Sequence, residues 1–142
     1  MKSLALAAGL IFATPALATP SVVPDLLPRL VGMSLFTFEE GFGQPARPCS
    51  FGATVLCSYD TGQGRLAVIY RGGHVEKVTW FVSKGTKAIS VDALRLGGAC
   101  ASKEVDRNTG SDVLRGCPGR LAVDLGNLKS GDMFSLTVWR EP

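Results

Sequence analysis

The four cysteines are the residues of this sequence whose type and spacing indicate a definite chemistry. Cys49, Cys57, Cys100 and Cys117 are an even number, which in an exported chain is typical of two disulfides. Three pairings are possible, and we expect the sequential one, because each pair brackets a loop-like stretch. A zinc site is disfavoured, since the sequence has no C-x-x-C pair and His74 is its only histidine.

Candidates for catalysis are few. His74 is the only imidazole available as an acid or base, but it directly follows two hairpin glycines, where an exposed, solvated side chain is usual. The G-x-S-x-G motif of serine hydrolases is absent. Glu39 and Glu40 are adjacent, so on a helix they point about 100° apart and do not form an acid–base pair. The sequence therefore predicts a non-enzymatic protein without a cofactor.

The segment 106–112 places oxygen-bearing side chains at alternate positions, a spacing that calcium loops use. It departs from the EF-hand pattern, because its glycine comes one position early and Cys117 stands where the bidentate glutamate belongs. The same residue types are ordinary turn formers. We therefore expect a turn, and no metal site.

Basic residues outnumber acidic ones between residues 45 and 87. Arg65, Arg71, His74 and Lys77 are the candidate contacts for a partner, which could be an acidic protein surface, an anionic lipid or a glycan. The alternative is that Lys and Arg protect sheet edges from pairing with other chains. The formal net charge of +3 is too small to indicate nucleic-acid binding.

The amino end has the three regions of a secretory signal peptide. Lys2 precedes an apolar stretch at residues 4–13, and residues 16–18, Ala-Leu-Ala, form a small-x-small cleavage site. We expect residues 1–18 to be removed, because prolines interrupt the stretch before it could span a membrane. The mature protein is then expected to be periplasmic or secreted, without a transmembrane segment.

The mature chain is long enough for one domain of ordinary size. Residues 19–31 contain three prolines and predict an extended lead-in, and residues 32–142 predict a single compact domain. Ser34 can cap a helix that runs to about Gly41, with Gly43 as its stop. Three strands follow at 54–59, 65–71 and 74–82, and Gly72-Gly73 suits a two-residue hairpin turn.

The second half has weaker signals. Residues 90–96 fit either a strand or a short capped helical turn. Alternating apolar residues predict strands at 121–125 and 134–138, joined around residues 127–132. The predicted class is α+β, mostly antiparallel β: a short helix packed on a β-meander, with Trp80 buried against the helix face of Leu35, Phe38 and Phe42.

One pentapeptide occurs twice. The sequence GRLAV at residues 64–68 recurs at 119–123, and each copy follows a cysteine pair and precedes a segment containing a tryptophan. A diverged tandem repeat of one helix, disulfide and strand unit would explain this order, with sub-units at 32–86 and 87–142. Chance recurrence of five residues is the alternative.

The stretch 32–80 resembles the SmpA/BamE-like small envelope proteins, whose fold also occurs in β-lactamase inhibitor proteins. The resemblance rests on Gly-Met-Ser at 32–34, Gly-Gln-Pro at 43–45, Tyr59, and the segments LAVIY at 66–70 and GHVEKV at 73–78. It implies a helix layer against an antiparallel sheet, a fold that relatives use to bind other proteins or the envelope. Members of the assembly type are usually lipoproteins, whereas in this chain no cysteine directly follows the expected cleavage site, where the lipid would be attached.

We therefore expect an exported binding protein, an inhibitor or an envelope accessory or assembly factor, that recognises another exported or envelope protein. One alternative is an envelope-surface module that binds anionic lipid or glycan through its basic side. Another is a small secreted hydrolase whose site the sequence does not reveal. The sequence indicates no oligomeric state.

Overall fold

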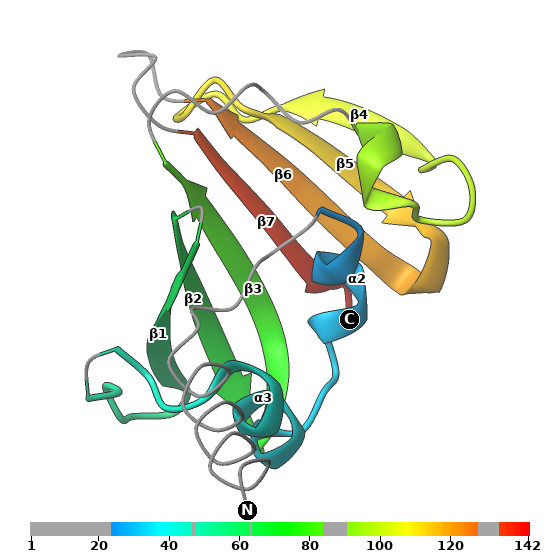
Figure 1. The fold of residues 1–142 in the computed structure, drawn as a ribbon. Helices are drawn as coiled ribbons and strands as arrows, with labels where there is room; N and C mark the ends of the chain where they lie inside the picture. The colour runs from blue at the N-terminus through cyan, green and yellow to red at the C-terminus, as the bar shows by residue number, and fades with distance from the viewer. Residues whose placement is uncertain (1–23, 47, 63, 84–90, 128–133) are drawn as a thin grey trace, which may run out of the picture.

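The computed structural model describes residues 24–142 except 47, 63, 84–90 and 128–133. The predicted signal peptide, the first part of the lead-in and most of the predicted 127–132 connection lie outside the described residues. The chain forms one seven-stranded antiparallel sheet, and the helices lie on one side of it (Figure 1). With two disulfides, the predicted α+β class is confirmed.

Two meanders make up the sheet, whose strand order is β1-β2-β3-β7-β6-β5-β4. All of its neighbouring strands run antiparallel. The bounds are β1 Val55–Thr61, β2 Gly64–Arg71, β3 His74–Val82, β4 Ser102–Val105, β5 Asp112–Cys117, β6 Leu121–Asn127 and β7 Phe134–Arg140. The three predicted strands of the first half are confirmed to within about two residues, and so are the predicted strands at 121–125 and 134–138.

The β3–β7 pair joins the two meanders into a single sheet. Val78 lies opposite Val138 in this pair, Val68 of β2 lies opposite Val78, and Val123 of β6 lies opposite Val138. All four valines are fully buried. A row of identical side chains therefore crosses the centre of the sheet on the side that faces the helices.

The same register places the two copies of the pentapeptide at equivalent positions, with Gly119 and Arg120 of the second copy in the 3-10 turn η3, Pro118–Arg120, that leads into β6. Between antiparallel strands, a local two-fold axis through the Val78–Val138 pair exchanges β3 with β7 and β2 with β6. Val68 and Val123, the last residues of the two copies, then occupy matching places. This placement agrees with the predicted duplication, which itself stays a prediction.

The helix α3, Leu35–Phe42, has the predicted caps at both ends. Ser34 Oγ accepts a hydrogen bond from the Thr37 N–H at 3.2 Å. Gly43 adopts φ 77°, which a residue with a side chain rarely does, and its N–H donates to the Glu39 carbonyl oxygen. The Leu35 N–H donates to the Gly73 carbonyl oxygen at 2.8 Å, which ties the start of the helix to the β2–β3 hairpin.

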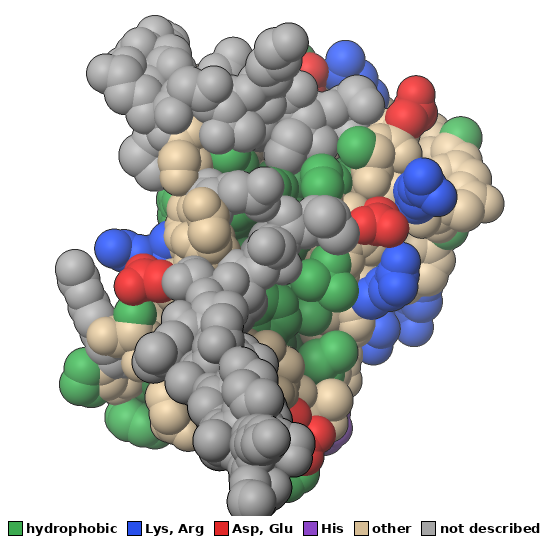
Figure 2. Space-filling model, in the orientation of Figure 1, with side chains coloured by type: hydrophobic (Ala, Val, Ile, Leu, Met, Phe, Trp, Pro, Cys, Tyr) green, Lys and Arg blue, Asp and Glu red, His purple; other side chains and the backbone are tan. Residues whose placement is uncertain are grey.

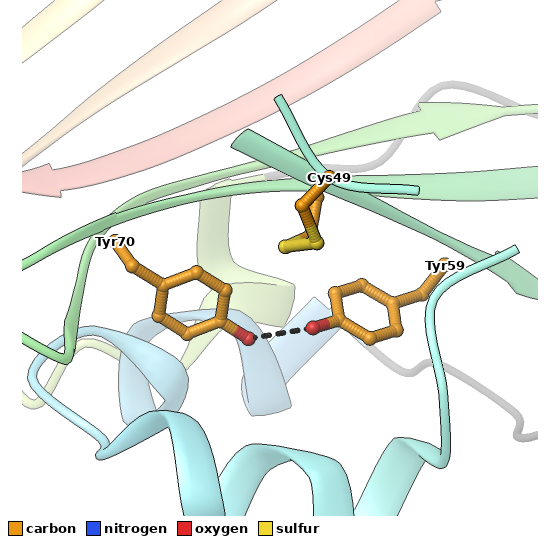
Figure 3. The surroundings of a disulfide bond; sticks show 4 residues. Cys49, Tyr59 and Tyr70 are labelled. Carbon is orange, nitrogen blue, oxygen red and sulfur yellow. Dashed lines mark hydrogen bonds between the residues drawn. A yellow bond between two sulfur atoms is a disulfide. The ribbon is translucent and has the colours of Figure 1, made fainter. Parts of the chain in front are cut away.

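Aromatic side chains fill the space between α3 and the first meander. Phe38 is fully buried, and its ring centroid lies 4.8 Å from that of Tyr59 and 6.0 Å from that of Tyr70. The two tyrosine hydroxyls point toward each other and hydrogen-bond at 2.9 Å beside the Cys49 disulfide (Figure 3). Burial raises the pKa of both hydroxyls.

Trp80 is buried, as predicted, with only 2% of its surface exposed. It belongs to the core that also contains Phe38, with Leu35 and Phe42 packed against it. Its indole Nε1 is buried and has no hydrogen-bond partner among the residues that the structure describes. The predicted sequential disulfides, Cys49–Cys57 and Cys100–Cys117, are both confirmed.

The lead-in is not extended over its described part, so that prediction was wrong. Residues Pro24–Leu26 form a 3-10 helix, η1, and Leu27–Leu30 form a short α-helix, α2. Both prolines, Pro24 and Pro28, lie in first turns, where the missing N–H has no intrahelical partner to lose. Leu27 and Leu30 are buried in the core, and their burial favours the helical conformation of this segment.

The second half also contains elements that the sequence did not predict. The ambiguous segment 90–96 contains a 3-10 helix, η2, at Val91–Leu94, whose Leu94 is fully buried. The strands β4 and β5 occupy a stretch expected to be a loop between Cys100 and Cys117. Their alternation is hard to recognise because all of β4 is exposed and β5 is irregular after Leu114.

Figure 2 shows the helix-bearing face of the molecule. Hydrophobic side chains occupy its middle, and several Lys and Arg side chains lie along the border near η2. None of the helices in the described ranges is long and apolar enough to cross a membrane.

Candidate functional site

The side of the sheet opposite the helices, which we call the outer face, is the candidate site. Successive residues of a strand point to opposite sides, so the outer face consists of the residues that alternate with the core ones. On the three central strands these are Arg65, Ala67 and Ile69 of β2, Lys77, Thr79 and Phe81 of β3, and Ser135, Thr137 and Trp139 of β7. All nine are half-buried or exposed.

The helical segments cover the other side. The buried side chains of α2, α3 and η2 all belong to one core cluster with the inward-facing residues of the sheet. Figure 1 shows α2 and α3 in front of the sheet. Within the described residues, no helix therefore shields the outer face.

The four predicted contact residues do not form one patch. Arg65 and Arg71 are six residues apart on β2, or about 20 Å along the strand. Arg65 Nε lies 3.7 Å from an Asp60 oxygen, and Arg71 Nε lies 3.1 Å from a Glu76 oxygen. Each of these two cations therefore has a carboxylate beside it.

His74 lies at the β2–β3 hairpin, as expected from the two glycines. It is exposed, and its Nδ1 hydrogen-bonds the Gly72 carbonyl oxygen at 3.1 Å. With Arg71 it lines an open hollow of about 400 Å³ that Arg140 and Glu141 border from β7 and the C-terminal residues. The structure thus brings Arg71 and His74 together, and places Arg65 at the opposite end of β2.

Lys77 lies near the middle of the outer face, directly opposite Trp139 of β7. Its Nζ is 5.3 Å from the centroid of the Trp139 ring, and the Arg115 Cζ is 5.9 Å from it. Both distances are within the range of a cation–π interaction. Trp139 is therefore held between two cations from neighbouring parts of the sheet.

Arg115 is fixed by two acidic side chains. Glu104 of β4 accepts a hydrogen bond from its Nε, and Glu141 accepts one from its Nη1 at 3.2 Å. Glu141 also accepts a hydrogen bond from the Gly116 N–H at 2.8 Å, which lowers the pKa of this carboxyl group. Lys77, by contrast, has no ion pair with any described residue.

A shallow hollow of about 630 Å³ lies on the outer face over β1–β3. Ser58 and Ala67 form part of its lining with the larger side chains Arg65 and Phe81. Gly64 at its margin has φ 143°, and a Cβ there would lie 2.0 Å from the Phe81 carbonyl oxygen. Only glycine allows β2 to approach β3 this closely.

Trp139 and Arg115 were not among the predicted site residues. Trp139 lies one position out of phase with the alternating Leu136 and Val138, and this phase alone would have placed it on the outer face. Arg115 belongs to β5, a strand that the sequence did not predict, so no pattern pointed to it.

Metal binding gains no support from the described residues, which contain no group of three or more His, Cys, Asp or Glu side chains able to hold an ion. Asp106 Oδ1 instead accepts hydrogen bonds from the N–H groups of Asn108 and Thr109, at 2.8 and 3.3 Å. This is the side-chain-to-backbone pattern of an Asx turn. The predicted turn is therefore present at this segment.

Comparison with known proteins gives similarity of fold alone. No family model and no curated protein matches the sequence. A DUF4309 family protein from Bacillus subtilis has 13% identity and a TM-score of 0.50, over 76% of this chain and 78% of that one. A cysteine-rich secretory protein from Staphylococcus aureus has 12% identity and a TM-score of 0.51, over 87% of this chain and 46% of that one.

Proposed function

We propose that this chain is an exported, non-enzymatic protein that binds another exported or envelope protein through its outer face. The observation that supports this most is Trp139, half-buried between Lys77 and Arg115 on a sheet face that no described helix covers. Tryptophan and arginine are enriched among the residues that contribute most to protein–protein binding. A Trp held by two cations loses little conformational freedom when a partner covers it.

The hollow over β1–β3, elsewhere on the outer face, supports the same role. Phe81 and Arg65 border a recess lined by small residues, so a partner side chain could enter it while Trp139 contacts the surrounding surface. Interfaces of this kind combine a central aromatic anchor with a polar rim. An inhibitor or an envelope accessory factor would both use such a face.

Export is supported by the two disulfides, because such bonds persist in oxidising compartments outside the cytoplasm. One structural neighbour is itself named a secretory protein, although only its fold is similar. Together with the signal-peptide pattern at residues 1–18, these observations favour a periplasmic or secreted location.

Binding of anionic lipid or glycan through the basic side is the less favoured role. Arg65 and Arg71 each lie beside a carboxylate, so this part of the sheet has little net positive charge to attract an anionic surface. Lys77 is the remaining cation of the predicted group. Its position over an indole ring suits a protein interface as well as a glycan.

The test is capture from periplasmic extract with the oxidised mature protein as bait, followed by rate measurements on the captured partner. We expect Trp139→Ala to abolish capture and Lys77→Glu to slow association, an effect that shrinks as salt rises. Arg29→Glu is the matched charge reversal, since Arg29 is exposed on α2 on the helix side, and it should bind normally.

His74→Ala should also bind normally. If Trp139→Ala and Lys77→Glu captured the same partner as the parent, the outer face would not be the binding face. A hydrolytic activity that a stable His74→Ala protein lost would instead show that the protein is an enzyme.

A further inference from the structure

A second surface, away from the outer-face cluster, exposes two large aromatic side chains. Phe51 is 82% exposed in the loop between Cys49 and Cys57, and Phe36 is 72% exposed on α3. In Figure 2, hydrophobic side chains protrude at the lower left, where this loop lies in Figure 1. Exposed aromatic side chains of this size mark contact surfaces more often than single exposed aliphatic ones do.

The loop that carries Phe51 is held in place. The Cys49–Cys57 disulfide closes it, and Ser50 and Leu56 exchange two backbone hydrogen bonds at 2.9 and 3.0 Å. The Ala46 N–H donates to the Ser58 carbonyl oxygen at 2.7 Å and fixes the preceding chain against β1. Binding through Phe51 therefore requires little ordering of the backbone.

A hollow of about 480 Å³ lies directly beside this loop. Its lining includes Pro45, Pro48 and Phe51 itself, with Glu39 of α3 on the other side. Phe36 is one helical turn from Glu39, on the same face of α3. A protruding ring and a recess thus lie next to each other on one surface.

We propose that a second copy of this chain occupies this surface, forming a two-fold dimer in which each Phe51 enters the hollow of the other copy. A two-fold interface uses the same patch on both subunits, so the patch must contain both a protrusion and its recess. Residues 48–58 contain no charged side chain, so the two loops themselves approach without charge repulsion, and Glu39 is the only charged residue among the described residues that line the hollow. The dimer does not rest on the proposed function, since Trp139 and Lys77 play no part in it.

The expected dimer is weak. A buried phenylalanine contributes about 150–250 Å² of contact, so two copies each of Phe51 and Phe36 account for roughly 600–1,000 Å². Stable interfaces bury about 1,200–2,000 Å². We therefore expect a dissociation constant on the order of 10 µM to 1 mM, and dissociation on dilution.

Sedimentation equilibrium on the oxidised mature protein, from about 1 µM to about 1 mM, tests this directly. The parent should change from monomer to dimer with rising concentration. Phe51→Ala should raise the dissociation constant by roughly 100-fold, because a two-fold interface loses the contact twice. Phe36→Ala should raise it by roughly 10-fold. Phe81→Ala is the matched control on the outer face, and it should leave the constant unchanged.

Phe51 is so exposed that its removal should leave the melting temperature of the dilute monomer as it is in the parent. A parent protein that stays monomeric over the whole range would overturn the proposal. A dimer that Phe51→Ala does not weaken would overturn it as well, since the copies would then meet elsewhere.

Discussion

The two halves of the sheet have similar centres but different covers. Both contribute two valines to the central row, and both have a disulfide that ends in a strand next to a copy of the pentapeptide. The first half is covered by α3, with Phe38 packed against two buried tyrosines. The second is covered by the four residues of η2, of which Leu94 alone is fully buried, and by α2, which contacts both β3 and β7. The central valines are therefore fully buried in both halves, although the helical segments over the two halves differ in length.

The tryptophans of the two halves lie on opposite faces of the sheet. Trp80 of β3 lies opposite Leu66 and Leu136, all inside the core. Trp139 of β7 lies opposite Lys77 and Ala122, on the outer face. If the two-fold axis at Val78–Val138 is applied, Trp80 corresponds to position 140, one residue from Trp139. An offset of one residue turns a strand side chain to the opposite face.

The largest expected effect sharpens this contrast. Trp80→Ala should lower the free energy of unfolding by about 3–5 kcal/mol, because it leaves a cavity among packed side chains. Trp139→Ala should cost about 1–2 kcal/mol, since it removes two exposed cation–π contacts and partial burial. Urea midpoints of the oxidised proteins measure both. Equal shifts would mean that the two tryptophans are buried alike.

Removal of each disulfide in turn tests whether the second half, which has the shorter helical cover, depends more on its disulfide than the first half does. The Cys100–Cys117 bond closes a separation of 17 residues and the Cys49–Cys57 bond one of 8. Chain-entropy reasoning gives about 3 and about 2.5 kcal/mol for the two. We expect the Cys100→Ala/Cys117→Ala protein to be the less stable of the two double variants in urea. If the Cys49→Ala/Cys57→Ala protein were the less stable one instead, the packing of α3 would make the first half depend more on the disulfide that closes its loop.

The tyrosine pair in the first half should respond non-additively. Tyr70→Phe leaves the Tyr59 hydroxyl buried without its partner, at a cost of about 1–3 kcal/mol. Changing both tyrosines to phenylalanine removes both hydroxyls, so the double variant should be more stable than either single one. A double-mutant cycle in urea measures the coupling. Strict additivity would show that the two hydroxyls do not depend on each other.

The smallest expected effect lies in the second half, at Glu141. The Gly116 N–H and then Arg115 lower the pKa of its carboxyl group below the unfolded value. The folded state therefore gains stability from this group above the unfolded pKa, and loses it as pH falls through the folded pKa. Glu141→Gln should be less stable than the parent at neutral pH, and the difference should vanish in acid. A difference in urea midpoint that is constant with pH would contradict this.

The first half was predictable because its signals are local. Alternation in 65–71 and 74–82, the Gly72-Gly73 turn and the Ser34 cap each act within a few residues. The lead-in helix was missed because prolines disfavour helix interiors, whereas here they occupy first turns and the long-range burial of Leu27 determines the outcome. No local sequence pattern indicates that Leu27 is buried.

The candidate site was only partly predictable for the same reason. Lys77 and Arg65 are on the outer face, as alternation would place them, but the cluster needs Trp139 and Arg115 from strands that are distant in sequence. Ion pairs between Arg71 and Glu76 and between Arg65 and Asp60 depend on the hairpin registers, so the neutralisation of the basic side was not visible either. The composition gives the number of charged residues but not which of them form ion pairs.

The β3–β7 pair also bears on how the chain would fold during the export that we propose. A chain that crosses a membrane amino end first presents β1–β3 well before β7, so residues 77–82 keep an unpaired strand edge until residues 134–139 arrive. Such an edge accepts a strand from any other chain. If the protein is exported as proposed, crowded molecules that have just crossed the membrane should exchange their last strand with one another, and the yield of correctly folded protein should rise when translocation is fast enough for each chain to supply its own β7 first.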